Sequence, residues 1–60
     1  MHTQLLAQYI NKAHAANSRG DFSIAVGLCK QAIKLAPNMP EAWYNYAVAL
    51  GGLGNRREAE

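Results

Sequence analysis

The fold is decided by residues 20–54, which read GDFSIAVGLCKQAIKLAPNMPEAWYNYAVALGGLG. Between positions 22 and 35 the apolar residues recur at the spacing of one face of a helix. Pro37 and Pro40 interrupt this helix, because a proline nitrogen cannot donate a backbone hydrogen bond. Proline is favourable at the first position of a helix, so another helix is predicted from residue 40 to about residue 53. The stretch therefore predicts two helices joined by a short turn.

The residues that precede this stretch predict a further helix over about 3–18. Apolar side chains from Leu6 to Ala16 follow the i, i+3, i+4 spacing of an amphipathic helix. Gly20 suits the left-handed conformation that ends many helices, and Asp21 suits the N-cap of the next one. A helical hairpin is therefore predicted ahead of the turn at the two prolines.

The residues that follow predict the start of a fourth helix at 56–60. Gly54 is placed to end the preceding helix, and Asn55 with Glu58 three positions later forms a capping-box pattern. No segment shows the alternating pattern of a strand. The chain is therefore predicted to be all-α, with helices at about 3–18, 22–35, 40–53 and 56–60.

The sequence also resembles itself after a shift of 34 positions. The pairs that coincide are Asn11 with Asn45, Ala13 with Ala47, Ala15 with Ala49, Gly20 with Gly54 and Ala25 with Ala59. The alanine pairs are inflated by the abundance of alanine, but the glycine and asparagine pairs occupy equivalent places in the two hairpins. Paired helices that recur every 34 residues are typical of tetratricopeptide arrays.

The chain resembles the tetratricopeptide repeat (TPR) family over nearly its whole length. The positions that carry the resemblance are Gly20, Asp21, Phe22, Ala25, Ala32, Pro37, Pro40, Trp43, Ala47 and Leu50. The resemblance implies a right-handed superhelix of antiparallel helix pairs. It also implies that residues 1–60 are a single TPR fragment, with repeat 1 at about 6–39 and a truncated repeat 2 at about 40–60. On the family pattern, Trp43 is expected to pack against the preceding hairpin, and Ala47 is small enough for a close approach of helices.

Composition and charge exclude several classes of function. The net charge of +2 is small and the lysines and arginines are spread along the 60 residues, so no nucleic-acid partner is expected. No apolar run approaches the ~20 residues of a membrane span, and no export signal is recognisable. The lone Cys29 fits a reduced compartment and lies on an apolar face, so we expect a cytoplasmic protein with a core cysteine. No residues are spaced for catalysis, a metal ion or a cofactor, so no enzyme activity is expected.

The TPR resemblance implies a binding groove, because the first helix of each repeat lines the concave face of such arrays. The residues carried over to this face are Asn11, His14, Glu41, Tyr44, Asn45 and Val48. Asn11 and Asn45 lie one period apart, and amide side chains that donate and accept could hold the backbone of an extended peptide. The alternative is that each asparagine bonds only to water or to a neighbouring helix.

A second set of apolar residues predicts contact with another subunit or domain. Ile24, Leu28, Gln31 and Leu35 form an additional stripe on the second helix, with simple packing at the helix end as the alternative. Trp43, Tyr46 and Leu50 have only the short fourth helix to cover them. Because stacked repeats bury a continuous core, we expect this chain either to form a homo-oligomer or to belong to a longer array.

Three functions are compatible with these observations. The first is a non-catalytic protein–protein interaction scaffold that binds a peptide or partner protein through the concave face. The second is the N-terminal TPR segment of a larger enzyme, such as a transferase, in which the repeats position substrate. The third is a self-association element whose only ligand is another copy of the chain.

Overall fold

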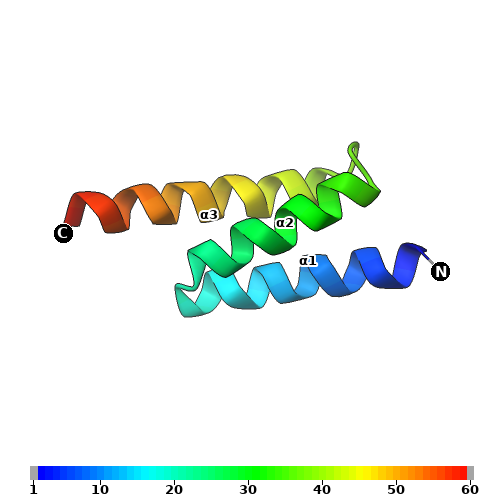
Figure 1. The fold of residues 1–60 in the computed structure, drawn as a ribbon, viewed down its shortest axis with the longest axis horizontal. Helices are drawn as coiled ribbons and strands as arrows, with labels where there is room; N and C mark the ends of the chain where they lie inside the picture. The colour runs from blue at the N-terminus through cyan, green and yellow to red at the C-terminus, as the bar shows by residue number, and fades with distance from the viewer. Residues whose placement is uncertain (1, 60) are drawn as a thin grey trace.

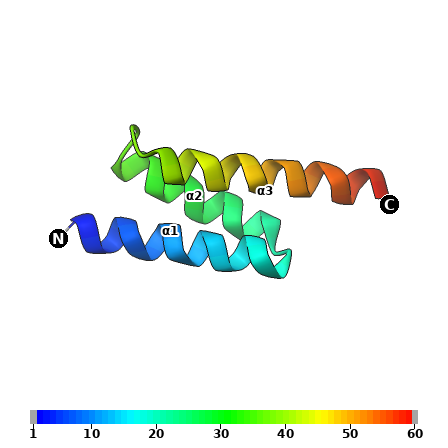
Figure 2. The same cartoon turned by 180° about the vertical axis from the view of Figure 1, so that it is seen from behind.

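The computed structural model describes the backbone of residues 2–59 and the side chains of residues 4–55. The described residues form three helices and no strand: α1 (His2–Arg19), α2 (Phe22–Leu35) and α3 (Pro40–Ala59). α1 and α3 run in the same direction and α2 runs back between them, so α1 begins and α3 ends at opposite ends of the molecule (Figure 1; Figure 2). The prediction of an all-α fold built from helical hairpins is confirmed.

The turn between α1 and α2 has the geometry that Gly20 predicts. Gly20 has a φ of +83°, in the left-handed region that glycine adopts without strain. Its N–H donates to the carbonyl of Asn17 at 3.1 Å, and the N–H of Asp21 donates to the carbonyl of Ala16 at 2.8 Å. These two bonds form a Schellman motif, which satisfies carbonyls at the end of α1. Asp21 occupies the N-cap of α2, but its side chain does not cap as predicted, because its carboxylate accepts from Nε of Arg19 at 3.1 Å.

Small side chains form the core at which the three helices meet. The buried apolar residues are Ile10, Ala13, Ala16, Ala25, Cys29, Ala32, Ala42 and Ala49. Ala16, Ala25 and Ala49, one from each helix, form a group that we call the alanine cluster. Because an alanine side chain ends at Cβ, the helix backbones can approach closely and pack without voids. The inward face predicted for the first helix is confirmed.

α3 is longer than predicted, and the fourth helix does not form. The helix continues through Gly54 and Asn55 to Ala59, so the predicted break at Gly54 and the predicted helix at 56–60 are wrong. The side chain of Glu58, the other half of the predicted capping box, lies outside the described residues. A new helix of five residues would carry the cost of nucleation with few contacts to offset it. Continuing α3 through a glycine costs only about 1 kcal/mol, so the longer helix is favoured.

The side of α3 that packs against α1 and α2 also differs from the prediction. Ala42, Asn45 and Ala49 are buried, whereas Ala47 is exposed and Trp43 retains 47% of its surface. At about 3.6 residues per turn the three buried positions fall on one stripe, and Trp43 and Ala47 lie beside it. Trp43 lies against the preceding hairpin as predicted, since its indole N–H donates to the carbonyl of Pro37, but about half of its surface stays exposed. The prediction that Ala47 permits the close approach of helices is wrong, because Ala42 and Ala49 occupy that place on α3.

A close contact between α2 and α3 explains one of the glycines. A Cβ at Gly52 would lie 2.5–2.6 Å from three ring carbons of Phe22, the first residue of α2. The ring of Phe22 therefore packs directly on the backbone of α3. At Gly51, the preceding residue of the same helix, a Cβ would meet no atom within 4 Å. Of these two glycines, only Gly52 is required by packing.

Candidate peptide-binding groove

Three adjoining hollows lie along α1 and α3 and form what we call the α1/α3 groove. The first measures about 170 Å³ and is lined by Leu6, Ala7, Ile10, Asn11, Met39 and Glu41. The second measures about 360 Å³ and is lined by His14, Pro40, Glu41, Tyr44 and Asn45. The third measures about 190 Å³ and is lined by His14, Asn17, Ser18, Tyr44, Asn45 and Val48. Each hollow shares lining residues with the next, so the three follow one another along the helices.

The α1/α3 groove brings together all six residues predicted for the concave face. These are Asn11, His14, Glu41, Tyr44, Asn45 and Val48. They meet because α1 and α3 run side by side in the same direction, which places positions one 34-residue period apart on a common face (Figure 2). Tyr44 exposes 69% of its surface, and it stands next to the buried stripe through which α3 packs on α1 and α2.

A pair of hydrogen bonds ties the floor of the groove together. Nδ2 of Asn45 donates to the carbonyl of Glu41 at 3.0 Å, one turn earlier in α3. Nδ2 of Asn17 in turn donates to the carbonyl of Asn45 at 3.1 Å, which joins α1 to α3. Sequence reasoning missed Asn17. The available signal was its position four residues after Ala13, on the buried stripe of α1, where a polar residue needs a partner.

The two asparagines one period apart have different surroundings. Asn11 is exposed in the first hollow, where its amide is accessible to a ligand. Asn45 is only 7% exposed, and its Nδ2 is engaged by the backbone of its own helix. For Asn45 the geometry therefore favours the alternative of bonding within the protein, so the two amides offer a ligand unequal hydrogen-bonding capacity.

Charged and reactive groups are sparse around the groove. His14 and Glu41 are exposed within it, and the ion pair of Arg19 with Asp21 lies at the α1–α2 turn. Burial raises the pKa of the Cys29 thiol, which keeps it protonated in the core and agrees with its predicted place there. In the part of the chain that the structure describes, no group of three His, Cys, Asp or Glu side chains is placed to hold a metal ion. No helix of that same part is both long enough and apolar enough to cross a membrane.

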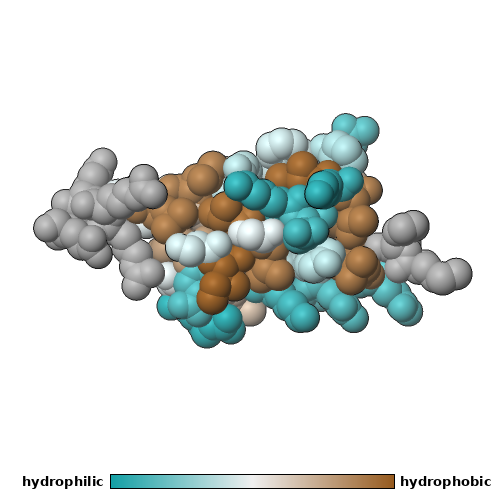
Figure 3. All heavy atoms as spheres, viewed as in Figure 1, coloured by the Kyte–Doolittle hydropathy of each residue, from teal (hydrophilic) through white to brown (hydrophobic). Residues whose placement is uncertain are grey.

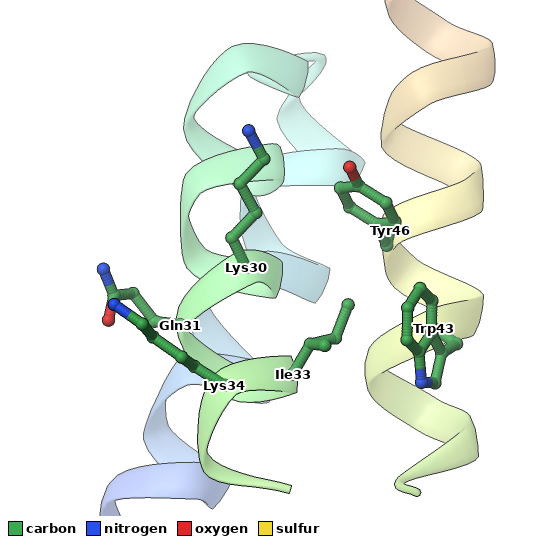
Figure 4. Close-up of a pocket in the computed structure, with 6 residues that line it drawn as sticks. All are labelled: Lys30, Gln31, Ile33, Lys34, Trp43 and Tyr46. Carbon is green, nitrogen blue, oxygen red and sulfur yellow. The ribbon is translucent and has the colours of Figure 1, made fainter. Parts of the chain in front are cut away.

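A further hollow, the α2/α3 groove, lies on another side of α3 (Figure 4). It measures about 500 Å³ and is lined by Lys30, Gln31, Ile33, Lys34, Trp43 and Tyr46. The indole N–H of Trp43 donates to the carbonyl of Pro37 at 2.6 Å, and its ring meets Tyr46 edge-on with centroids 6.0 Å apart. Trp43 is therefore held against the turn that precedes α3, although half of its surface is exposed.

The residues predicted for self-association differ in exposure. Ile24 exposes 56% of its surface, and Trp43 and Leu50 expose 47% each. Tyr46 is half-buried, and Leu28 is half-buried against the alanine cluster. The predicted additional stripe is therefore exposed at Ile24, Gln31 and Leu35 but not at Leu28, which packs against the alanine cluster. Figure 3 shows apolar surface in separate patches between polar ones on the face that carries α2.

The helices and the two grooves define a class of protein, an all-α chain of stacked helical hairpins. A family model described as "Tetratricopeptide repeat" matches residues 28–60, which is more than half of the chain. The chain belongs to the tetratricopeptide repeat family. Comparison with curated proteins and with solved structures gave no significant match.

Membership of the family indicates a general kind of function. Tetratricopeptide repeats generally mediate protein–protein interaction and are generally non-catalytic. The matched residues begin within α2 and continue through the turn and along α3. The repeat boundaries at 6–39 and 40–60 stay a prediction.

Proposed function

We propose that this chain is a protein-interaction module that holds an extended peptide along the α1/α3 groove. The observation that carries the proposal is that all six residues expected on the concave face line adjoining hollows between two parallel helices. Membership of the TPR family supports the coarser statement, because its repeats generally bind other proteins.

The groove offers such a peptide both contact area and hydrogen bonds. Tyr44 is an exposed aromatic side chain on a rigid helix, and it supplies a large contact area with little loss of conformational entropy. Val48, which is 39% exposed, extends the apolar contact by one turn. Asn11 can donate to and accept from a peptide group, and the neighbouring Glu41 and His14 add polar contacts. The groove thus offers both apolar and hydrogen-bonding contacts. Such contacts suit an extended peptide, whose backbone forms hydrogen bonds while its side chains alternate in direction.

Asn17 belongs to the floor of the groove and is not a contact for a ligand. Its Nδ2 bonds to the carbonyl of Asn45, and its Oδ1 is buried without a hydrogen-bond partner among the described residues. Because that oxygen is buried, the amide that a peptide can reach is the exposed one of Asn11.

The test is to select peptides on the protein and then alter the groove. Peptides taken from a random library against the whole chain should bind the Tyr44→Ala variant about tenfold or more weakly, since a buried aromatic anchor commonly dominates an interface. The matched control is Gln31→Ala, which removes an exposed side chain of α2 outside the groove. Peptides whose binding depends on Gln31 and not on Tyr44 would refute the proposal.

A second candidate function is self-association, and one observation favours it. Ile24, Trp43 and Leu50 leave large apolar surfaces exposed on α2 and α3. Full burial of such a side chain is worth about 1.5–3 kcal/mol, so a second copy that covered them would be stabilised. Sedimentation over a range of micromolar concentrations tests this candidate, and a folded monomer throughout the range would exclude it.

A further inference from the structure

We propose that the second hollow of the α1/α3 groove selects an arginine side chain of the bound peptide, with Glu41 and Tyr44 as the residues that determine this specificity. The proposal rests on the peptide-binding function proposed above and names the chemistry that the peptide must carry. Three features of the hollow favour arginine: its negative charge, its aromatic wall and its unfavourable setting for anions.

The α1/α3 groove carries a single formal charge. With histidine counted as neutral at pH 7, Glu41 is the only charged residue among those that line the three hollows. Its side chain is exposed, lines both the first and the second hollow, and forms no ion pair with another described side chain. The chain as a whole has a net charge of +2, so the groove is a local negative site on a positive protein. A cationic side chain is therefore the complementary group for a ligand to bring here.

The aromatic wall of the hollow favours arginine over lysine. Glu41 and Tyr44 are three residues apart on α3, so their side chains are neighbours on one face of the helix. Tyr44 exposes 69% of its surface and lines the same hollow of about 360 Å³. A guanidinium group can stack on an aromatic ring while two of its N–H groups donate to a carboxylate. The compact ammonium group of lysine has no flat face to stack and no fork of donors, so it fits this pair less well.

The position of Glu41 also disfavours an acidic peptide. Glu41 lies in the first turn of α3, which begins at Pro40. The N-terminus of a helix carries a partial positive charge and commonly attracts carboxylate or phosphate groups. Here the carboxylate of Glu41 already occupies that region, and it would repel a second anion. The hollow therefore discriminates between peptides by the sign of their charge as well as by shape.

Selection from a random peptide library tests the specificity directly. Peptides selected on the whole chain should be enriched in arginine over lysine, and in both over aspartate and glutamate. The Glu41→Gln variant should lose this enrichment, and Glu41→Lys should select acidic peptides instead. The Glu41→Asp variant keeps the charge and should still prefer arginine. The Tyr44→Leu variant keeps an apolar side chain without a ring, so it should reduce the preference for arginine over lysine.

A double-mutant cycle tests whether Glu41 contacts the arginine. The two probes are a selected arginine peptide and its citrulline analogue, in which an uncharged urea group of similar shape replaces the guanidinium. Citrulline alone and Glu41→Gln alone should each weaken binding about tenfold, between the effect of an exposed ion pair and that of a buried charged hydrogen bond. Together they should weaken it little further, because both remove the same interaction. The control is Gln31→Lys on α2, which raises the net charge by the same one unit outside this groove and should have little effect.

The outcomes separate this inference from the function on which it rests. Selected peptides that depend on Tyr44 but show no enrichment in arginine would leave the peptide-binding function standing and overturn the inference. Additive effects of citrulline and Glu41→Gln would also overturn it, because the two groups would not interact. A loss of affinity in Gln31→Lys as large as in Glu41→Gln would assign the preference to net charge. Failure to select any peptide would overturn both.

Discussion

Alanine at position 52 should leave the protein less stable than alanine at position 51, although both residues lie in α3. Inside a helix, alanine is favoured over glycine by about 1 kcal/mol, and this gain applies equally to the two positions. At Gly51 the new methyl group would meet no atom within 4 Å. At Gly52 it would lie 2.5–2.6 Å from the ring of Phe22, well inside the ~3.5–4.0 Å of a normal carbon contact. The ring or the helix must therefore move.

The magnitude follows from the difference between the two variants. Both variants gain the same helix propensity. The difference between their free energies of unfolding is therefore the cost of forcing a methyl group into an occupied space, about 1–3 kcal/mol. In a domain of this size 1 kcal/mol shifts the melting temperature by about 4–8 °C. The Gly52→Ala variant should therefore melt at least about 4 °C below Gly51→Ala, which itself should melt above the original protein.

Thermal and urea unfolding followed by circular dichroism would measure these differences. The decisive control is the Phe22→Ala background, in which the ring is absent and alanine at 52 should be tolerated as well as alanine at 51. Equal stability of Gly51→Ala and Gly52→Ala in the original background would refute the packing of Phe22 on α3. A difference that persisted without Phe22 would assign the effect to another cause.

Three further predictions concern the turn, the groove and the buried thiol. Gly20→Ala should lower the free energy of unfolding by about 1–2 kcal/mol in urea titrations, because a side chain is strained at a φ of +83°. Asn17→Ala should cost about 1 kcal/mol in the same assay by removing the bond to the carbonyl of Asn45, and an unchanged midpoint would show that this bond is dispensable. Because burial raises the pKa of Cys29, the thiol ionises first in the unfolded chain. Stability should therefore be full below the ordinary cysteine pKa and fall as pH rises above it, and this fall should be absent from Cys29→Ala.

The residues of the α1/α3 groove could be predicted from the sequence because they follow the 34-residue repeat. A shift of 34 positions relates Asn11 to Asn45, and helices that run in parallel bring such positions to one face. Asn17 could not be assigned a role in this way. Its bond to the carbonyl of Asn45 depends on the distance between α1 and α3, which side-chain packing determines. The α2/α3 groove could not be predicted as a hollow either, because it depends on how α2 and α3 pack, although Trp43 and Tyr46 were predicted to be poorly covered.

The sequence by itself determined the three-helix order and the two turns, because their signals are local. Gly20 needs only its own backbone freedom to end α1, and Pro37 and Pro40 separate α2 from α3 through their missing N–H groups. Only the tertiary structure decided which stripe of α3 is buried and whether Gly54 ends the helix. A break and a continuation at Gly54 differ locally by about 1 kcal/mol, so contacts with the rest of the molecule select between them. The rotation of α3 about its axis is likewise set by the sum of contacts that the alanine cluster and Phe22 make with it.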